Sequence, residues 1–127
     1  MDPRASRRTP AARAEVTRLT LVGTRLDYLD LRGAKVHELR LSRLAVRDLD
    51  LAHAEVANMV VDDSRVDRLD VTESRLRDVD PRGAELAAVD GVAGLAGATV
   101  GWDQLVGLAP LLAAHLRVTV EHRPSPL

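Results

Sequence analysis

The stretch TRLDYLDLRGAKVHELRL, residues 24–41, carries apolar residues at alternating steps of three and two. They are Leu26, Leu29, Leu31, Ala34, Val36, Leu39 and Leu41. An α-helix turns by about 100° per residue, so this spacing would spread the apolar side chains around the helix and leave it no buried face. A regular strand requires strict alternation, which fails at every third step. The stretch therefore predicts short extended segments that turn a corner every five residues.

The five-residue register continues unbroken from Ala14 to Gly91, through sixteen units. Each unit is a triplet of inward, outward and inward residues followed by two spacers, as in Ala34-Lys35-Val36. Residues two apart point to the same side of an extended segment, and two spacers are enough to turn a corner. The chain therefore predicts a β-solenoid whose coils stack at a spacing of about 4.8 Å.

Composition fits one narrow solenoid domain. The chain has 127 residues, of which 46% are hydrophobic and only 2% aromatic, so leucine, valine and alanine must fill the core. The lack of cysteine excludes a disulfide framework, a cysteine-ligated zinc site and a thiol nucleophile. No apolar run reaches the roughly 18 residues of a membrane span, and the N-terminus lacks the apolar region of a signal peptide. We therefore expect a soluble, cytoplasmic protein without membrane association.

The repeat resembles the pentapeptide-repeat family, whose units carry a small residue, Asp or Asn, Leu or Phe, and two variable residues. The segments LRGAKV, LAHAEV and PRGAEL are close to this pattern, with Ala34, Ala54 and Ala84 at the small position. Every second unit departs from it by carrying Leu, Met or Val there, and Pro81 and Gly91 replace the central apolar residue. The resemblance implies an all-β solenoid, a right-handed quadrilateral β-helix of about four to five coils of twenty residues each.

Two other repeat folds fit the spacing less well. A leucine-rich repeat contains LxxLxL, but its unit of 20–29 residues includes a helical return arm that this sequence lacks. A left-handed β-helix of hexapeptide repeats needs a period of six, which the sequence does not offer.

Beyond Gly91 the register shifts by one residue, leaving further triplets at 93–95 and 98–100. The stretch WDQLVGLAPLLAAHL, residues 102–116, then favours a helix, with Asp103 as the expected N-cap and Pro110 expected to break or kink it. The following RVTVEH alternates like a final edge strand. This arrangement resembles the C-terminal end of actinobacterial-type pentapeptide-repeat proteins, where it would cover the open edge of the last coil.

These patterns divide the chain into four segments. They are a disordered basic N-terminal tail (1–13), the pentapeptide-repeat β-helix (14–100), a helical cap with a terminal strand (101–121) and a disordered tail (122–127).

No residue pattern indicates catalysis. The histidines are scattered without metal-ligand spacing and are expected to be exposed: His37, His53, His115 and His122. Ser64 and Ser74 occupy inward small positions, so we interpret them as core residues bonded to backbone. Neither a glycine-rich phosphate loop nor H-E-x-x-H occurs. We predict no catalytic, cofactor-binding or metal-binding residues, and therefore no enzyme.

Outward residues twenty apart should stack on one face of the solenoid. One such column alternates in charge: Glu15, Lys35, Glu55 and Arg75. Another is wholly acidic and is the candidate partner-binding stripe: Asp30, Asp50, Asp70 and Asp90. Neighbouring carboxylates about 5 Å apart repel by about 0.8 kcal/mol in bulk water. Two accounts stay open: the aspartates bond corner amides and are partly neutralised by Arg32, Arg47 and Arg68, or the stripe binds something basic.

The predicted function is a non-enzymatic structural or protein-interaction module with an unknown protein partner. Some members of the resembled family look like DNA in shape and charge, bind type II topoisomerases and protect them from quinolones. The repeat region 19–90 has 15 acidic and 11 basic residues, a net charge of −4, which is only weakly acidic. The alternative is therefore a DNA-mimicking, gyrase-binding protein of bacterial origin. Direct nucleic-acid binding is not expected, since the whole chain has a net charge of −1.

The C-terminal helix carries more apolar surface than one contact face needs. We expect its apolar residues to cover the last coil, to form a homodimer, or to do both: Trp102, Leu105, Leu108, Leu111, Leu112 and Leu116. The chain is accordingly expected to be a monomer or a homodimer through this cap.

Overall fold

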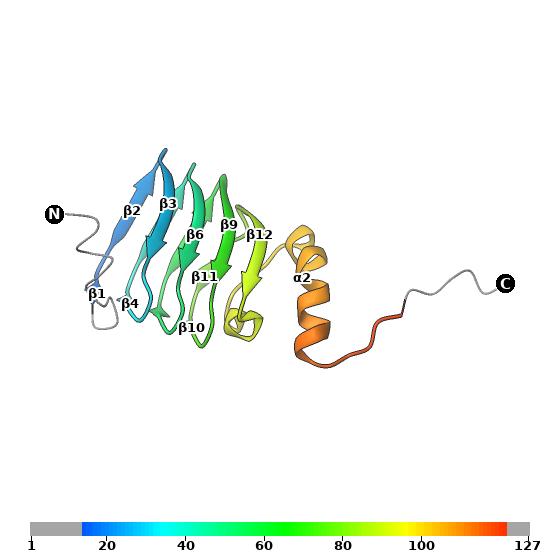
Figure 1. The fold of residues 1–127 in the computed structure, drawn as a ribbon. Coiled ribbons are helices and arrows are strands. Elements are labelled where there is room, and N and C mark those ends of the chain that lie inside the picture. The colour runs from blue at the N-terminus through cyan, green and yellow to red at the C-terminus, as the bar shows by residue number, and fades with distance from the viewer. Residues whose placement is uncertain (1–13, 122–127) are drawn as a thin grey trace.

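A computed structural model describes residues 14–121 as a column of parallel strands followed by one helix (Figure 1). The two tails predicted to be disordered, 1–13 and 122–127, lie outside the described residues. The twelve strands of the described part form three parallel sheets. The first contains β1 (Glu15–Val16), β4 (Lys35–Val36), β7 (Glu55–Val56) and β10 (Arg75–Leu76). The second contains β2 (Leu19–Val22), β5 (Leu39–Ser42), β8 (Met59–Asp62) and β11 (Val79–Asp80), and the third contains β3 (Arg25–Asp30), β6 (Ala45–Asp50), β9 (Ser64–Asp70) and β12 (Ala84–Asp90).

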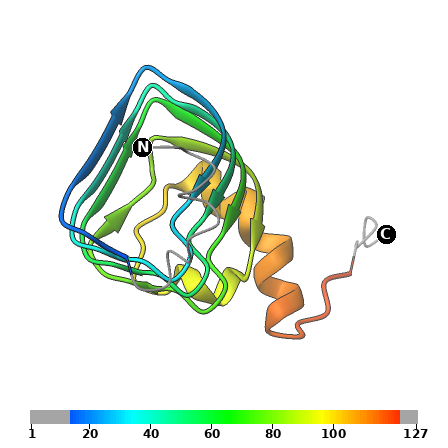
Figure 2. The same cartoon turned by 60° about the vertical axis from the view of Figure 1, so that its left-hand side comes forward.

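The strand register confirms the predicted coil of twenty residues. Each strand pairs in parallel with residues twenty positions along the chain, as Glu15 pairs with Lys35 and Lys35 with Glu55. The coil has a four-sided outline (Figure 2), and the third sheet bends around one corner, where Asp27 and Arg47 drop out of the pairing. The predicted all-β solenoid of about four coils followed by a short helix is therefore confirmed, with three sheets forming its sides.

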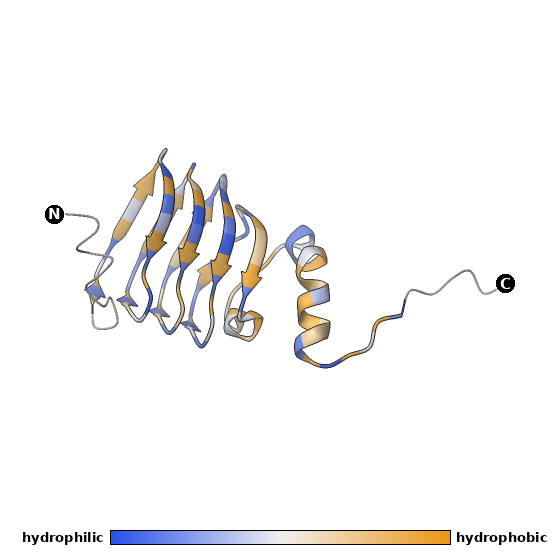
Figure 3. Ribbon diagram, in the orientation of Figure 1, coloured by the Kyte–Doolittle hydropathy of each residue, from blue (hydrophilic) through white to orange (hydrophobic). Residues whose placement is uncertain are grey.

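The core is the column of inward residues that the triplets predict. Val36, Leu39 and Leu49 are buried, and Val56 in the third coil is only 2% exposed. Apolar and polar bands run across neighbouring strands, because the same position recurs in every coil (Figure 3). Full burial of one valine or leucine side chain stabilises a fold by about 1.5–3 kcal/mol, so this column supplies the main favourable free energy of folding.

The corners require a left-handed backbone, which glycine adopts without a steric penalty. The chain uses glycine there only in part, and two stacked corners carry larger residues in later coils: Gly23, Arg43 and Asp63 at one, Gly33, His53 and Glu73 at the other. A left-handed residue other than glycine costs roughly 1–2 kcal/mol. Hydrogen bonds between coils hold these corners, as His53 N donates to Thr72 O at 2.8 Å.

The segment after Gly91 only partly follows the predicted triplets. Ala98 forms a parallel bridge with Val79, nineteen residues away, in agreement with the shift of one residue. The triplet expected at 93–95 was wrong, because Val92–Leu95 forms a 3-10 helix, η2. The chain passes so close to the coil beneath that a Cβ at Gly94 would collide with the carbonyl oxygen of Val71.

The predicted helix is present as α2 (Trp102–His115), but its details differ from the prediction. It begins two residues earlier than expected, so Gly101 rather than Asp103 is the N-cap. Asp103 lies in the first turn, where its charge favours the helix dipole. Pro110 does not break the helix, which continues to His115. Proline leaves the Val106 carbonyl without its helical partner, and water can bond that carbonyl because Val106 is exposed.

The edge strand expected from RVTVEH is not formed by its described residues. Leu116 and Arg117 form a turn, and 118–121 have no regular structure. Val118 and Val120 are both exposed, so alternation of apolar and polar residues was not enough to place this segment in a sheet. Within the described range, no helix is long and apolar enough to cross a membrane.

Candidate interaction surfaces

Three of the four aspartates in the candidate stripe bond to the backbone of their own corners. Asp30 Oδ1 accepts a hydrogen bond from Arg32 N at 3.0 Å, and Asp50 Oδ1 accepts one from Ala52 N at 3.0 Å. Asp70 Oδ1 accepts from both the amide and the hydroxyl of Thr72, at 2.9 and 2.6 Å. A carboxylate that bonds the amide two residues later forms an Asx turn, which stabilises a corner. These three aspartates therefore have a structural task.

Tyr28 covers the second aspartate of the stripe. Tyr28 belongs to the preceding coil, and its hydroxyl donates to Asp50 Oδ2 at 2.8 Å. Asp50 is only 9% exposed. Burial, together with the hydrogen bond to Asp50, raises the pKa of Tyr28 to about 12. Sequence reasoning missed Tyr28, although it is the only tyrosine in the chain and stands two residues before the first aspartate of the stripe.

Arginines neutralise the stripe only at its ends. Arg32 Nη2 lies 3.9 Å from Asp30 Oδ2, and Arg68 Nε lies 3.3 Å from Asp90 Oδ2. Arg47, which we expected to contribute, makes no ion pair with the described residues. These contacts agree with the first of the two accounts, in which the aspartates serve the corners. The Asp90 side chain is about half exposed and is more open than that of Asp30.

The alternating column neutralises itself. Glu55 lies between two cations, with Lys35 Nζ at 3.8 Å and Arg75 Nη1 at 3.7 Å from its carboxylate oxygens. His37 Nε2 lies 3.0 Å from Glu15 Oε2, and this hydrogen bond lowers the pKa of Glu15. Exposed pairs of this kind contribute little to stability. Because the signs cancel locally, this face has no single charge to attract a partner.

The two inward serines lie where the triplets predicted. Ser64 Oγ donates to Asp62 O at 2.8 Å and accepts from Leu44 N at 3.0 Å. Ser74 Oγ donates to Gly94 O at 3.1 Å. Both hydroxyls thus connect neighbouring turns of the backbone. In residues 14–121, no group of three histidine, aspartate or glutamate side chains could hold a metal ion.

Helix α2 crosses the open end of the last coil (Figure 2) and contacts it with one side. Leu108 is 5% exposed and joins the core, Leu112 packs against it, and Leu105 is half-buried. Gln104 fastens the helix to the coil, since its Nε2 donates to Pro81 O at 2.6 Å and to Ala84 O at 2.8 Å. No sequence pattern indicated Gln104, because its contacts depend on how the helix lies on the last coil.

The other side of α2 is apolar and open to solvent. Trp102 is 82% exposed, and Val106 and Leu116 are also largely exposed. The six cap residues named from the sequence therefore divide into two groups: Leu105, Leu108 and Leu112 face the column, whereas Trp102 and Leu116 face away. Leu111, at 38% exposed, lies at the boundary between the two sides.

The chain matches no protein-family model, no curated protein and no solved structure. The family resemblance therefore rests on the residue pattern alone.

Proposed function

We propose that the chain is a pentapeptide-repeat protein that acts as a non-enzymatic interaction module through the outer face of α2. Its register of five residues per side and twenty per coil supports the family assignment. The column supplies a rigid support, because each inner coil is hydrogen-bonded to the coils on both sides. The cytoplasmic location and bacterial origin inferred from the sequence stay predictions.

The exposed side of α2 is the observation that supports this function. Trp102 and Val106 are four residues apart, so they lie on one face of the helix, and Leu116 extends the apolar surface at its end. Tryptophan is enriched among residues that dominate binding free energy at interfaces. A second copy is the first partner to test, because a two-fold axis would pair this face with itself.

Static light scattering over a range of protein concentrations tests the self-association. The intact chain should approach twice its 13.8 kDa mass, and Trp102→Glu should have the mass of one chain. Val60→Glu is the matched control, because Val60 is an exposed valine on the second sheet, away from α2. An intact chain that stays at 13.8 kDa throughout would refute self-association.

Leu112 is the wrong position at which to break such a dimer. Its side chain packs against the core on the column side, so Leu112→Glu should loosen the cap and lower stability. Comparison of Leu112→Glu with Trp102→Glu therefore separates the two sides of the helix.

The alternative function, a DNA-mimicking gyrase-binding protein, is supported by the family resemblance and the weak acidity of the repeat region. The local bonds of Asp30, Asp50 and Asp70 leave less carboxylate charge to face a partner. A gyrase supercoiling assay with and without a quinolone distinguishes the two functions. An effect of the chain in that assay would favour the alternative.

A further inference from the structure

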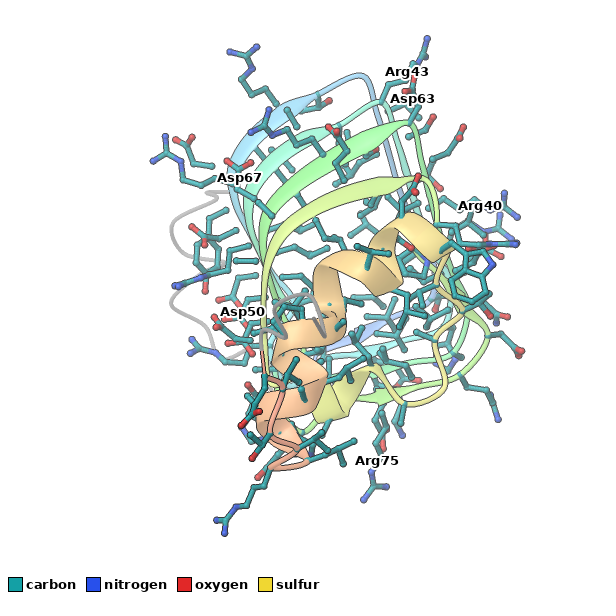
Figure 4. The ribbon with its side chains drawn as sticks, turned by 90° about the vertical axis from the view of Figure 1, so that its right-hand side faces the viewer. Arg40, Arg43, Asp50, Asp63, Asp67 and Arg75 are labelled. Atoms are coloured by element: carbon teal, nitrogen blue, oxygen red, sulfur yellow. The ribbon has the colours of Figure 1, made fainter. Side chains whose placement is uncertain are left out.

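A groove of about 870 Å³ lies between α2 and β12. Leu86 and Ala88 of β12 line it on the coil side, and Gly107, Leu108 and Leu111 line it on the helix side. Figure 4 looks onto this end of the column, where α2 crosses the last coil and β12 runs along its rim. The groove is thus a separate surface from the outer face of α2.

One edge of β12 has no partner strand among residues 14–121. β12 is the terminal strand of the third sheet and pairs only with β9. Along a parallel strand, the N–H and C=O groups of successive residues point alternately to the two neighbouring strands. In β9, Ser64 N donates to Gly83 O in the following coil, and Arg65 N donates to Leu44 O in the preceding coil. By this register Leu86 directs its N–H and C=O to the free edge. Gln104 already occupies the neighbouring carbonyl of Ala84.

Gly107 keeps the groove open. A glycine inside a helix costs about 0.8–1 kcal/mol relative to alanine. Packing does not require this one, because a Cβ built at Gly107 would meet nothing within 4 Å. Gly107 therefore lowers the stability of the helix compared with an alanine, and it does so at a position that lines the groove. A larger residue there would fill the space beside β12.

The groove is acidic. Four exposed carboxylates line it, and none of them has an ion-pair partner among residues 14–121: Asp62, Asp63, Glu85 and Asp103. Arg82 is the single cation that the described part of the chain places in the groove. It is held by Asp80 through bonds of 2.9 and 2.8 Å, which also lower the pKa of Asp80. In Figure 4 Asp63 lies at an outer corner of the column. The unpaired charge that lines the groove is therefore negative.

We propose that this groove binds an extended, basic peptide segment of a partner protein, which adds a strand to the free edge of β12. Backbone hydrogen bonds to Leu86 would align the segment, as in other proteins that recognise peptides at a sheet edge. Small apolar side chains would enter the space beside Gly107, and arginine or lysine side chains would meet the carboxylates. The inference rests on the proposed role as an interaction module but uses a different surface from the outer face of α2.

Fluorescence polarisation with a fluorescein-labelled peptide of about seven alternating valine and arginine residues tests the proposal. The intact chain should bind it saturably, and a valine and glutamate peptide should not bind. N-methylation of alternate amides should weaken binding at least about tenfold, because it removes the hydrogen bonds to a strand edge. Equal binding of the N-methylated peptide would overturn strand addition.

Two groove variants with matched controls locate the site. Gly107→Trp should abolish binding, whereas Val106→Trp, one residue away on the outer face, should leave it unchanged. Glu85→Lys should weaken binding about tenfold, whereas Glu121→Lys, which makes the same charge change beyond α2, should not. Far-UV circular dichroism checks that Gly107→Trp stays folded. If Gly107→Trp unfolds, Glu85→Lys alone tests whether the peptide binds in the groove.

The proposal is overturned if the intact chain does not bind the basic peptide, or if both groove variants bind it like the intact chain. If Gly107→Trp converts a dimeric chain to a monomer, the groove holds a second copy, which also overturns an external partner. A monomeric chain that binds the peptide would refute self-association through the outer face of α2 and support the groove.

Discussion

The repeat column and the C-terminal segment are both rich in leucine and valine, but the surroundings of their apolar side chains differ. In the middle coils, Leu39, Leu49 and Val56 are buried by neighbours above, below and across the column. In α2, Leu108 is buried whereas Trp102 is 82% exposed. Backbone pairing at a fixed period determines which way every side chain of the column points. A single helix on a coil end can bury only one of its sides, so the other is available to a partner.

The largest expected effect is the loss of the cap. A chain truncated after Val100 removes α2, including Leu108 and the two hydrogen bonds from Gln104 to the last coil. Without α2 beside it, the free edge of β12 is fully open and the apolar end of the column is uncovered, so this fragment should aggregate. Size-exclusion chromatography at increasing concentration measures this. A soluble, folded fragment would show that α2 is not a cap.

A charge placed inside the column should be the next most damaging change. Val56→Asp buries an unpaired carboxylate at a position that is 2% exposed, and should lower the free energy of unfolding by roughly 3–5 kcal/mol. Glu55→Asp, at the outward neighbour, should change it by less than about 0.5 kcal/mol. Urea denaturation of both variants gives the two values. Similar damage at both positions would contradict the inward and outward assignment.

The smallest expected effect comes from Tyr28. Its pKa in the folded chain is raised to about 12 from an ordinary value of 10.0, so the neutral phenol stabilises the fold fully below pH 10. That contribution should be lost as the pH rises from 10 to 12. Tyrosinate absorbance follows the titration directly, because the chain has one tyrosine. Asp50→Asn should bring the pKa back towards 10, and an unchanged pKa would refute the role of the hydrogen bond to Asp50.

The sequence predicts the column well because its period is a local property that repeats sixteen times. The inward position of Ser64 follows from that period, whereas the twenty-residue stacking of Glu15 and Lys35 follows from the four-sided coil that the family resemblance implies. The structure confirms both. Where the period ends, prediction weakens. The 3-10 helix at Val92–Leu95 depends on the close passage of Gly94 over Val71, which no local pattern reveals.

The candidate surfaces were only partly predictable for a related reason. The column of Asp30, Asp50 and Asp70 was visible, but their bonds to corner amides depend on side-chain rotation. The number of apolar residues in α2 indicated more apolar surface than one contact face needs. Which of them face the column depends on how Gln104 and Leu108 hold the helix against the last coil. The groove beside β12 arises only from the helix and the last coil together.

Amide hydrogen exchange followed by mass spectrometry tests most directly the claim that a rigid column carries a helix held on one side. Amides bonded between the inner coils, such as Leu39 N to Asn58 O and Arg65 N to Leu44 O, should exchange most slowly. Those of α2 should exchange faster, and residues 118–121 fastest. Protection of α2 equal to or greater than that of the middle coils, or rapid exchange throughout the repeats, would contradict the account.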